Sequence, residues 1–292
     1  MRPYPGSCAN TWVRKCRRPL PWHHERVLRK LVVLMTLAGV TVGAVGASSG
    51  LASASSVTPS GGTTYEGPGT ASAEDAVTAY MNAMAAGDLD QMVGTFAVES
   101  YVDNFDFDGY LARIRAYSPF VAPLLVPPAT PFTRALDVEQ RQGAVVGQIA
   151  RQYLGLAVPD LDLTQTVNLP DDSSVGDLST ELTTAVTGVD LSGVGSFTFV
   201  PLADVDAAAA TNYASEQNRA NLDAYRASVG ADEVTDVVVR FEVGGQSFLG
   251  FFSALRYGDA WWLDQIGGNF SVLVGVDAFH TGAAPEGDVG TG

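Results

Sequence analysis

Beyond residue 54, the 292-residue chain has no cysteine, no lysine and a single histidine, His280. Both cysteines, Cys8 and Cys16, lie in the first 54 residues, as do both lysines. The later chain therefore forms no disulfide of its own and offers neither a thiol nor an amine nucleophile. It also lacks the His and Cys set of a zinc site and any glycine-rich phosphate loop, so we expect no metal and no cofactor.

Positive charge is also scarce in the later chain. It holds nine of the 17 basic residues and 31 of the 32 acidic residues, which gives a net charge of −22. Nucleic-acid binding rests on clustered Lys and Arg that neutralise phosphates, so this composition excludes nucleic acid as a partner. An acidic surface is typical of a protein that stays soluble outside the cell.

The first 54 residues have the order of an export signal. A basic region ends at Lys30, an apolar run covers 31–47, and Ala52-Ser53-Ala54 matches the small-residue cleavage pattern. The run is shorter than the about 20 residues of a membrane-spanning helix. We predict a signal peptide over 1–54 and an extracellular or cell-envelope location. The alternative is an uncleaved anchor that meets the membrane only through its apolar run.

Composition divides the rest of the chain into one domain with two irregular ends. Ser, Thr, Gly and Pro dominate 55–72, which predicts a disordered linker, and 281–292 is predicted to be a disordered tail for the same reason. Between them, 73–280 is predicted to form a single α+β domain. Its first helix has Ser72 as a candidate N-cap and Gly87 as its end.

The segment "NFDFDGYLARIR" has the spacing of half an EF-hand calcium loop. Asn104, Asp106 and Asp108 stand two residues apart. A complete loop needs a bidentate Glu at its twelfth position, and that position is Arg115. We therefore predict no calcium site, and expect Asp106 and Asp108 to cap the helix that follows.

The strongest structural signal is a three-strand meander near the end of the chain. Two-residue turns, Gly244-Gly245 and Gly258-Asp259, separate runs of β-branched and aromatic residues. The expected strands are 233–243, 246–257 and 260–266. The turns place Phe241 opposite Phe248, Val237 opposite Phe252, Leu255 opposite Trp262, and Ser253 opposite Asp264.

This register sorts the side chains of the meander onto two faces. One face is nearly all apolar and is expected to be core: Val237, Val239, Phe241, Phe248, Phe252, Ala254, Trp261 and Leu263. The other, here called the mixed face, combines two sets: apolar Val238, Phe251, Leu255, Trp262 and Ile266, and polar Asp236, Arg240, Glu242, Ser253 and Asp264. Three interpretations are open for the mixed face: a layer covered by helices with polar rims, the wall of a ligand pocket, or an oligomer interface.

Two segments of the chain resemble the NTF2-like cone-fold family. The opening "AEDAVTAYMNAMAAGDLDQMVGTF" is similar to the first two helices of that family, and "VVVRFEVGGQSFLGFFSALRYGDAWWLDQIGG" to its closing strands. The resemblance implies N-terminal helices packed on a twisted antiparallel sheet, with a conical pocket between sheet and helices. Residues 100–230 have more helix than the family shows, which indicates either a helical insertion or a different α+β fold. The fold serves enzymes, small-molecule binders and interaction domains, so it implies no single activity.

The mixed face also gives the candidate site. If it lines a pocket, the groups expected to contact a ligand are Asp236, Arg240, Ser253, Trp262 and Asp264. If it does not, these are rim residues that meet solvent.

We predict an exported, non-enzymatic domain that binds a small apolar molecule or an envelope protein. One alternative is a hydrolase or isomerase that uses the carboxylates of Asp236 and Asp264 in a cone-shaped pocket. Another is a membrane-anchored accessory protein of the envelope. The sequence carries no signal for an oligomeric state.

Overall fold

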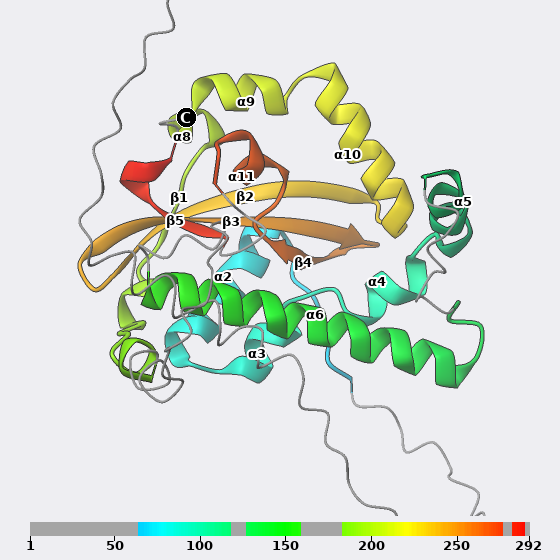
Figure 1. Cartoon of the computed structure of the whole chain (residues 1–292), viewed down its shortest axis with the longest axis horizontal. Coiled ribbons are helices and arrows are strands. Elements are labelled where there is room, and N and C mark those ends of the chain that lie inside the picture. The colour runs from blue at the N-terminus through cyan, green and yellow to red at the C-terminus, as the bar shows by residue number, and fades with distance from the viewer. Residues whose placement is uncertain (1–63, 118–126, 159–182, 277–281, 290–292) are drawn as a thin grey trace, which may run out of the picture. The chain divides into compact units, whose positions relative to one another are not determined.

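The computed structural model describes residues 64–117, 127–158, 183–276 and 282–289 (Figure 1). Its strands form one antiparallel sheet with helices on both faces, an α+β fold. The predicted signal peptide, half of the predicted linker (55–63) and His280 lie outside the described residues.

The elements follow one another in this order. The α-helices are α2 (Ala73–Ala86), α3 (Leu89–Gly94), α4 (Glu99–Asn104), α5 (Phe107–Tyr117), α6 (Pro131–Ala157), α8 (Leu202–Val205), α9 (Ala207–Tyr213), α10 (Glu216–Val229) and α11 (Asn269–Leu273). Two 3₁₀ helices are η1 (Ser192–Gly195) and η2 (Glu286–Asp288). The strands are β1 (Thr198–Phe199), β2 (Glu233–Val243), β3 (Gln246–Tyr257), β4 (Ala260–Ile266) and β5 (Ala283–Pro285).

Capping residues define both ends of α2 and the start of α3. The Ser72 hydroxyl accepts a hydrogen bond from the Asp75 N–H, and Gly87 ends α2 with φ of 66°. That left-handed conformation favours glycine, which has no Cβ to clash. Asp88 then caps α3 by accepting from the Gln91 N–H. The predicted caps of the first helix, Ser72 and Gly87, are confirmed.

The sheet has the strand order β1-β2-β3-β4. The predicted register between the first two strands of the meander, β2 and β3, is confirmed. Phe241 lies opposite Phe248 and Val237 opposite Phe252. The second turn places Leu255 opposite Trp262 as predicted. Two-residue glycine turns match the natural twist of paired strands, so they fix the register close to each turn.

A β-bulge shifts the register further from the second turn. Ala254 pairs with Leu263, but Ser253 pairs with Gln265, so Asp264 is an extra residue in β4. The predicted pairing of Ser253 with Asp264 is therefore wrong. A bulge leaves one residue unpaired and reverses the alternation beyond it. Ile266, predicted on the mixed face, consequently lies opposite Phe252 on the core face.

The C-terminal segment adds a strand that the sequence did not predict. β5 pairs with the first half of β3, with Leu249 opposite Ala284, while β4 pairs with the second half. The tail expected to be disordered over 281–292 thus contains a paired strand. Backbone N–H and C=O groups drive this pairing, and they are present whatever the side chains are.

The end of the predicted linker is also bound to the sheet. Thr70 and Trp261 exchange backbone hydrogen bonds of 3.0 and 2.9 Å. The Glu66 carboxylate accepts from the backbone N–H groups of Val98 and Ser100 at the start of α4. The ordered domain therefore begins before residue 73.

Helices cover both faces of the sheet. The core face packs against α2, α3 and α6, with Tyr80, Phe252 and Leu263 fully buried in one cluster. The opposite face packs against α8, α9 and α11 around Phe251 and Phe270, and against the end of α10 through Val229. Figure 1 shows these two sets of helices on opposite sides of the strands. The interpretation of the mixed face as a helix-covered layer is confirmed for Val238, Phe251 and Leu255.

Candidate ligand-binding site

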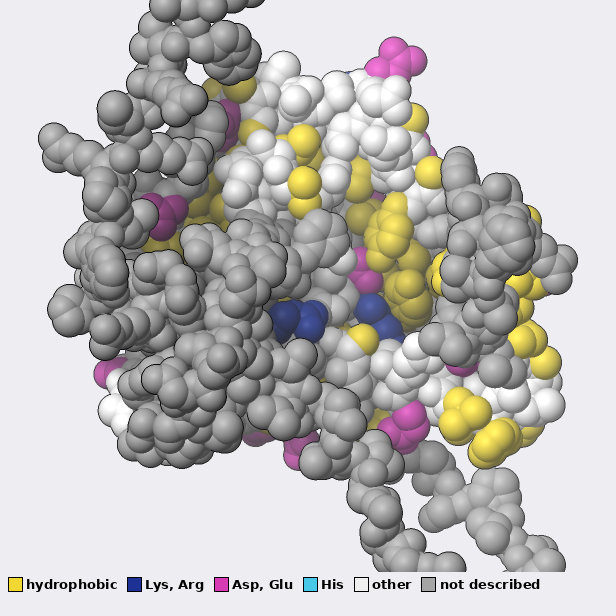
Figure 2. Space-filling model, in the orientation of Figure 1, with side chains coloured by type: hydrophobic (Ala, Val, Ile, Leu, Met, Phe, Trp, Pro, Cys, Tyr) yellow, Lys and Arg dark blue, Asp and Glu magenta, His cyan; other side chains and the backbone are white. Residues whose placement is uncertain are grey.

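A pocket of about 330 Å³ lies over one end of the mixed face. Its lining residues come from α6 (Gln148, Arg151), α10 (Asn221, Leu222, Tyr225), β2 (Val234, Asp236), β3 (Ser253), β4 (Gln265, Ile266), Gly268 and α11 (Asn269, Val272). Figure 2 shows hydrophobic side chains gathered beneath α10 and arginine side chains along α6. The volume is at the small end of the range of about 300–1,000 Å³ typical of ligand pockets.

Among the described residues that line the pocket, Asp236 is the only acid, and it is buried, with 9% of its surface exposed. Its Oδ2 atom accepts a hydrogen bond of 2.7 Å from the backbone N–H of Phe270. Its Oδ1 atom is buried and has no hydrogen-bond partner among the described residues. A buried polar atom without a partner is uncommon in folded proteins and calls for an explanation.

Glycine allows the chain to close over this carboxylate. Gly268 has φ of 107°, and a Cβ added to it would lie 2.8 Å from Asp236 Oδ1. Any other residue would combine a strained backbone with a steric clash. The close approach lets the Phe270 N–H reach the carboxylate of Asp236, which lines the pocket.

The surroundings of Asp236 disfavour its charged form. Burial raises its pKa to about 7, and the charge of Asp264 adds to this increase. The Phe270 N–H and the Ser253 hydroxyl lower the pKa, but their effect is smaller than that of burial. Near neutral pH the side chain therefore exchanges between its acid and carboxylate forms.

The rest of the pocket is neutral or apolar, apart from one arginine at its rim. Ser253 lies opposite Asp236 across the β2–β3 pair and is buried. Asn221, Gln265 and Asn269 contribute amide groups. Four aliphatic side chains supply apolar wall: Leu222, Val234, Ile266 and Val272. A few polar groups on an apolar wall are typical of small-molecule sites.

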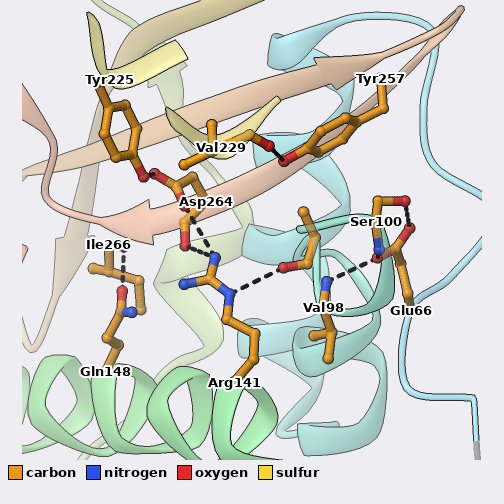
Figure 3. Close-up of polar contacts among 11 residues, drawn as sticks. Glu66, Val98, Ser100, Arg141, Gln148, Tyr225, Val229, Tyr257, Asp264 and Ile266 are labelled. Carbon is orange, nitrogen blue, oxygen red and sulfur yellow. Dashed lines mark hydrogen bonds and ion pairs between the residues drawn. The ribbon is translucent and has the colours of Figure 1, made fainter. Parts of the chain in front are cut away.

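Asp264 does not line this pocket, although the sequence placed it with Asp236. Its carboxylate accepts from Arg141 Nη2 at 3.0 Å and from the Tyr225 hydroxyl at 2.5 Å (Figure 3). Only 1% of its surface is exposed. Burial and the negative charge of Asp264 raise the pKa of Tyr225, so that hydroxyl remains a donor. The bulge points Asp264 toward these partners at the β4 edge.

Arg141 links α6 to this edge of the sheet. Besides the Asp264 carboxylate, it donates to the backbone carbonyls of Asp264 and Ala97, at 2.7 and 3.1 Å. Its guanidinium carbon lies 4.1 Å from the centre of the Tyr101 ring, a cation–π contact. Asp264 and Arg141 thus form a buried ion pair whose groups are used by the protein itself.

Two other predicted site residues lie away from the pocket. Trp262 is buried in a cluster with Leu255, and its indole N–H donates to the Gly67 carbonyl at 3.1 Å. Arg240 lies at the surface and pairs with Glu286 through hydrogen bonds of 2.9 and 2.6 Å. Of the five predicted residues, the structure brings only Asp236 and Ser253 together at the pocket.

Several lining residues escaped the sequence analysis. Gln265 turns toward the pocket because of the bulge, and no residue pattern announces that bulge. Asn221 and Tyr225 come from a helix whose packing partner the sequence did not reveal. Gly268 carried a usable signal, because paired glycines after a strand often mark a close backbone approach.

The calcium-like segment forms a helix cap. Asp106 Oδ1 accepts from the Gly109 N–H at 3.0 Å, and α5 begins at Phe107, as a capping aspartate requires. Asp108 lies within the first turn of the helix. Within the described ranges, no group of three or more His, Cys, Asp or Glu side chains is arranged to hold a metal ion.

Comparisons with known proteins assign no family. No family model matches the chain, and no curated protein sequence matches it. A structure search finds the crystal structure of a cystatin-like protein from Ruminococcus gnavus, with a TM-score of 0.34 and 12% identity. The match covers 66% of this chain and 39% of the other, so it spans well under half of that protein. Such a likeness assigns neither a family nor an activity.

Proposed function

We propose that this domain is an NTF2-like binding module, not an enzyme, and that it holds a small molecule in the pocket beside Asp236. The observation that carries the proposal is the buried Oδ1 atom of Asp236, which lacks a partner next to a pocket of about 330 Å³. A ligand that donates a hydrogen bond would satisfy this atom, and the aliphatic wall would bury the ligand's apolar part.

The cone-fold character rests on the order and packing of the elements. Two helices, α2 and α3, precede the sheet and pack on its core face, and the β2–β3–β4 meander follows. Helices α8 to α10 stand where the sequence indicated an insertion. The pocket is lined by α10 of this inserted layer, by α6 and α11, and by the ends of β2, β3 and β4.

A binding role is favoured over paired-acid catalysis because the two aspartates are separated in function. Asp264 is held by Arg141 and Tyr225, so it is not available to a substrate in the pocket. Of the described pocket-lining residues, Asp236 is the only carboxylate, and none is His, Cys or Lys. Two-carboxylate hydrolysis needs both groups at the same bond.

A steric block tests the proposal. Leu222→Trp enlarges a side chain on the pocket wall, and Leu89→Trp makes the same change at an exposed position on α3. In calorimetric titrations with a library of small amphipathic fragments, beginning with 2-phenylethanol, we expect binders that Leu222→Trp abolishes and Leu89→Trp leaves unchanged. The pocket is refuted as a binding site if the variant is still folded and Leu222→Trp abolishes the binding of no fragment.

One observation favours a second candidate, an isomerase that uses a single base. The pKa of Asp236, raised by burial to about 7, suits proton transfer near neutral pH. If a substrate screen finds turnover that Asp236→Asn abolishes without unfolding the protein, this candidate replaces the binding module.

We also propose that the domain acts outside the cytoplasm. The order of basic, apolar and small residues over 1–54 supports export, and that segment lies outside the described residues. No described helix has the length and apolar character to cross a membrane. N-terminal sequencing of secreted protein is expected to begin at Ser55. A full-length, membrane-bound form would instead support the anchored envelope accessory protein.

A further inference from the structure

We propose that the ligand of this pocket is a small organic ammonium ion with an apolar body, whose N–H groups bind Asp236 Oδ1. The inference rests on the proposed binding function and specifies its ligand class. It follows from the position of one unpartnered carboxylate oxygen within a wall that is otherwise amide, hydroxyl and aliphatic.

The geometry at Oδ1 calls for a donor from outside the protein. Oδ2 is satisfied by the Phe270 N–H, whereas Oδ1 is buried without a partner. An unpaired buried acceptor costs free energy, and a donor in the pocket would remove that cost.

The charge around the pocket favours a cationic donor over a neutral one. Within the part of the chain that the structure describes, the only cationic side chain of the lining is Arg151, which is exposed and forms no hydrogen bond with Asp236 Oδ1. The carboxylate charge is therefore not neutralised locally. An ammonium group brings both the missing donor and the missing charge, and charge-assisted hydrogen bonds are roughly twice as strong as neutral ones.

The remaining wall sets the other features of the ligand. Leu222, Val234 and Val272 provide apolar surface for a short hydrocarbon or aromatic body. The amides of Asn221 and Gln265 accept hydrogen bonds without carrying charge. The volume of about 330 Å³ restricts the body to a small group.

Four ionisable groups surround Asp236 on the elements packed against it. The Tyr213 hydroxyl on α9 accepts from the Asp236 N–H, and Tyr225 lines the pocket from α10. Burial raises the pKa of both tyrosines, so both stay neutral. Asp264 on β4 raises the pKa of Asp236, and Arg151 on α6 is at the rim. Protonation of Asp236 is therefore the change that removes the pocket's negative charge between pH 5.5 and pH 8.

Three probes of similar shape but different charge measure the effect of charge on binding. Phenethylammonium, 2-phenylethanol and phenylacetate are titrated into the purified full chain at pH 8 by calorimetry. We expect the ammonium to bind about tenfold to a hundredfold more tightly than the alcohol, and the carboxylate to bind more weakly still. At pH 5.5 the ammonium should lose roughly tenfold or more of its affinity, because Asp236 is then protonated. The alcohol should lose little.

A charge-removing variant identifies the group responsible. Asp236→Asn keeps the shape of the side chain and an oxygen that can accept from the Phe270 N–H. It should remove the preference for the ammonium over the alcohol. Asp259→Asn makes the same change in the exposed β3–β4 turn and should leave the preference unchanged.

The outcomes distinguish this inference from the proposed function. The ammonium proposal is overturned if the alcohol binds as tightly as the ammonium, or more tightly, at pH 8. It is also overturned if Asp236→Asn keeps the preference for the ammonium. Neither result refutes the pocket as a binding site, which the Leu222→Trp variant tests separately. Absence of phenethylammonium binding at millimolar concentration also overturns the ammonium proposal. If the steric test finds no fragment whose binding Leu222→Trp abolishes, the binding function itself is refuted.

Discussion

Asp236 and Asp264 are two buried aspartates close to the same end of the sheet, and the protein uses them differently. Asp264 has an arginine on one carboxylate oxygen and a tyrosine hydroxyl on the other. Asp236 has one backbone N–H and one oxygen without a partner. A carboxylate whose oxygens are all bound supports the fold, whereas one with an unbound oxygen at a pocket is available to a ligand. Burial alone does not separate the two roles.

The strongest test of this difference is to remove the partner of Asp264. Arg141→Ala leaves a buried carboxylate without its cation, and we expect it to lower the free energy of unfolding by about 3–5 kcal/mol. Chemical denaturation monitored by circular dichroism measures the change. Arg134→Ala removes an exposed arginine from its ion pair with Asp103, so it should cost less than about 1 kcal/mol. Equal losses in the two variants would contradict a structural role for the buried pair.

Asp236→Asn should raise the free energy of unfolding, because the charged side chain of Asp236 destabilises the folded protein. Its folded pKa of about 7 is above the value of about 3.9 for an unfolded aspartate. The folded protein therefore binds the extra proton between these values and loses stability as pH rises toward 7. Without a ligand, Asp236→Asn should exceed wild type by about 2–4 kcal/mol at pH 8 and match it near pH 4.

The control for this pH profile is Asp259→Asn, whose side chain is exposed. Denaturant unfolding at several pH values should give parallel curves for this variant and wild type. A pH profile of Asp236→Asn that is also parallel to wild type would show that burial does not shift the pKa of Asp236.

A smaller effect is expected when the second partner of Asp264 is removed. Tyr225→Phe deletes one hydroxyl that donates to a charged oxygen, and we expect a loss of about 1–2 kcal/mol in thermal or chemical unfolding. Tyr257→Phe removes a hydroxyl that donates to the neutral carbonyl of Val229 and should cost less. A larger loss from Tyr257→Phe would mean that Asp264 does not depend on Tyr225.

The smallest effect is expected at Arg240, which the sequence placed in the site. Its partner Glu286 and both side chains are partly exposed, so Arg240→Ala should change stability by less than about 1 kcal/mol. Fragment binding to the pocket should be unchanged, since Arg240 does not line it. Weakened binding in this variant would place the ligand elsewhere on the mixed face.

The sequence predicted the parts of the fold that depend on local patterns. The first helix with its caps, and the meander close to its glycine turns, follow from residue type and spacing. Alternation also identified the core face, including Val239 and Phe252. These features were predictable because each depends on interactions between residues close together in the chain or across a tight turn.

The site was only half predictable, because it depends on one inserted residue and on distant helices. The alternation of side chains along β4 cannot show that Asp264 is the bulged residue. It therefore placed Asp264 opposite Ser253 and Ile266 on the mixed face, and both placements were wrong. The partner of Asp264 is Arg141, 123 residues earlier in the chain, and no short-range pattern connects the two. Asp236 was identified because it lies in the regular part of the register.

β5 protects the sheet from other chains. The first half of β3 has β2 on one side, and only the short β5 pairs with its other side through Leu249 and its neighbours. Without that segment, a row of N–H and C=O groups flanked by Phe248 and Phe251 would be open to the strand of a second molecule. We therefore expect a version shortened before Gly282 to aggregate even if its pocket is intact.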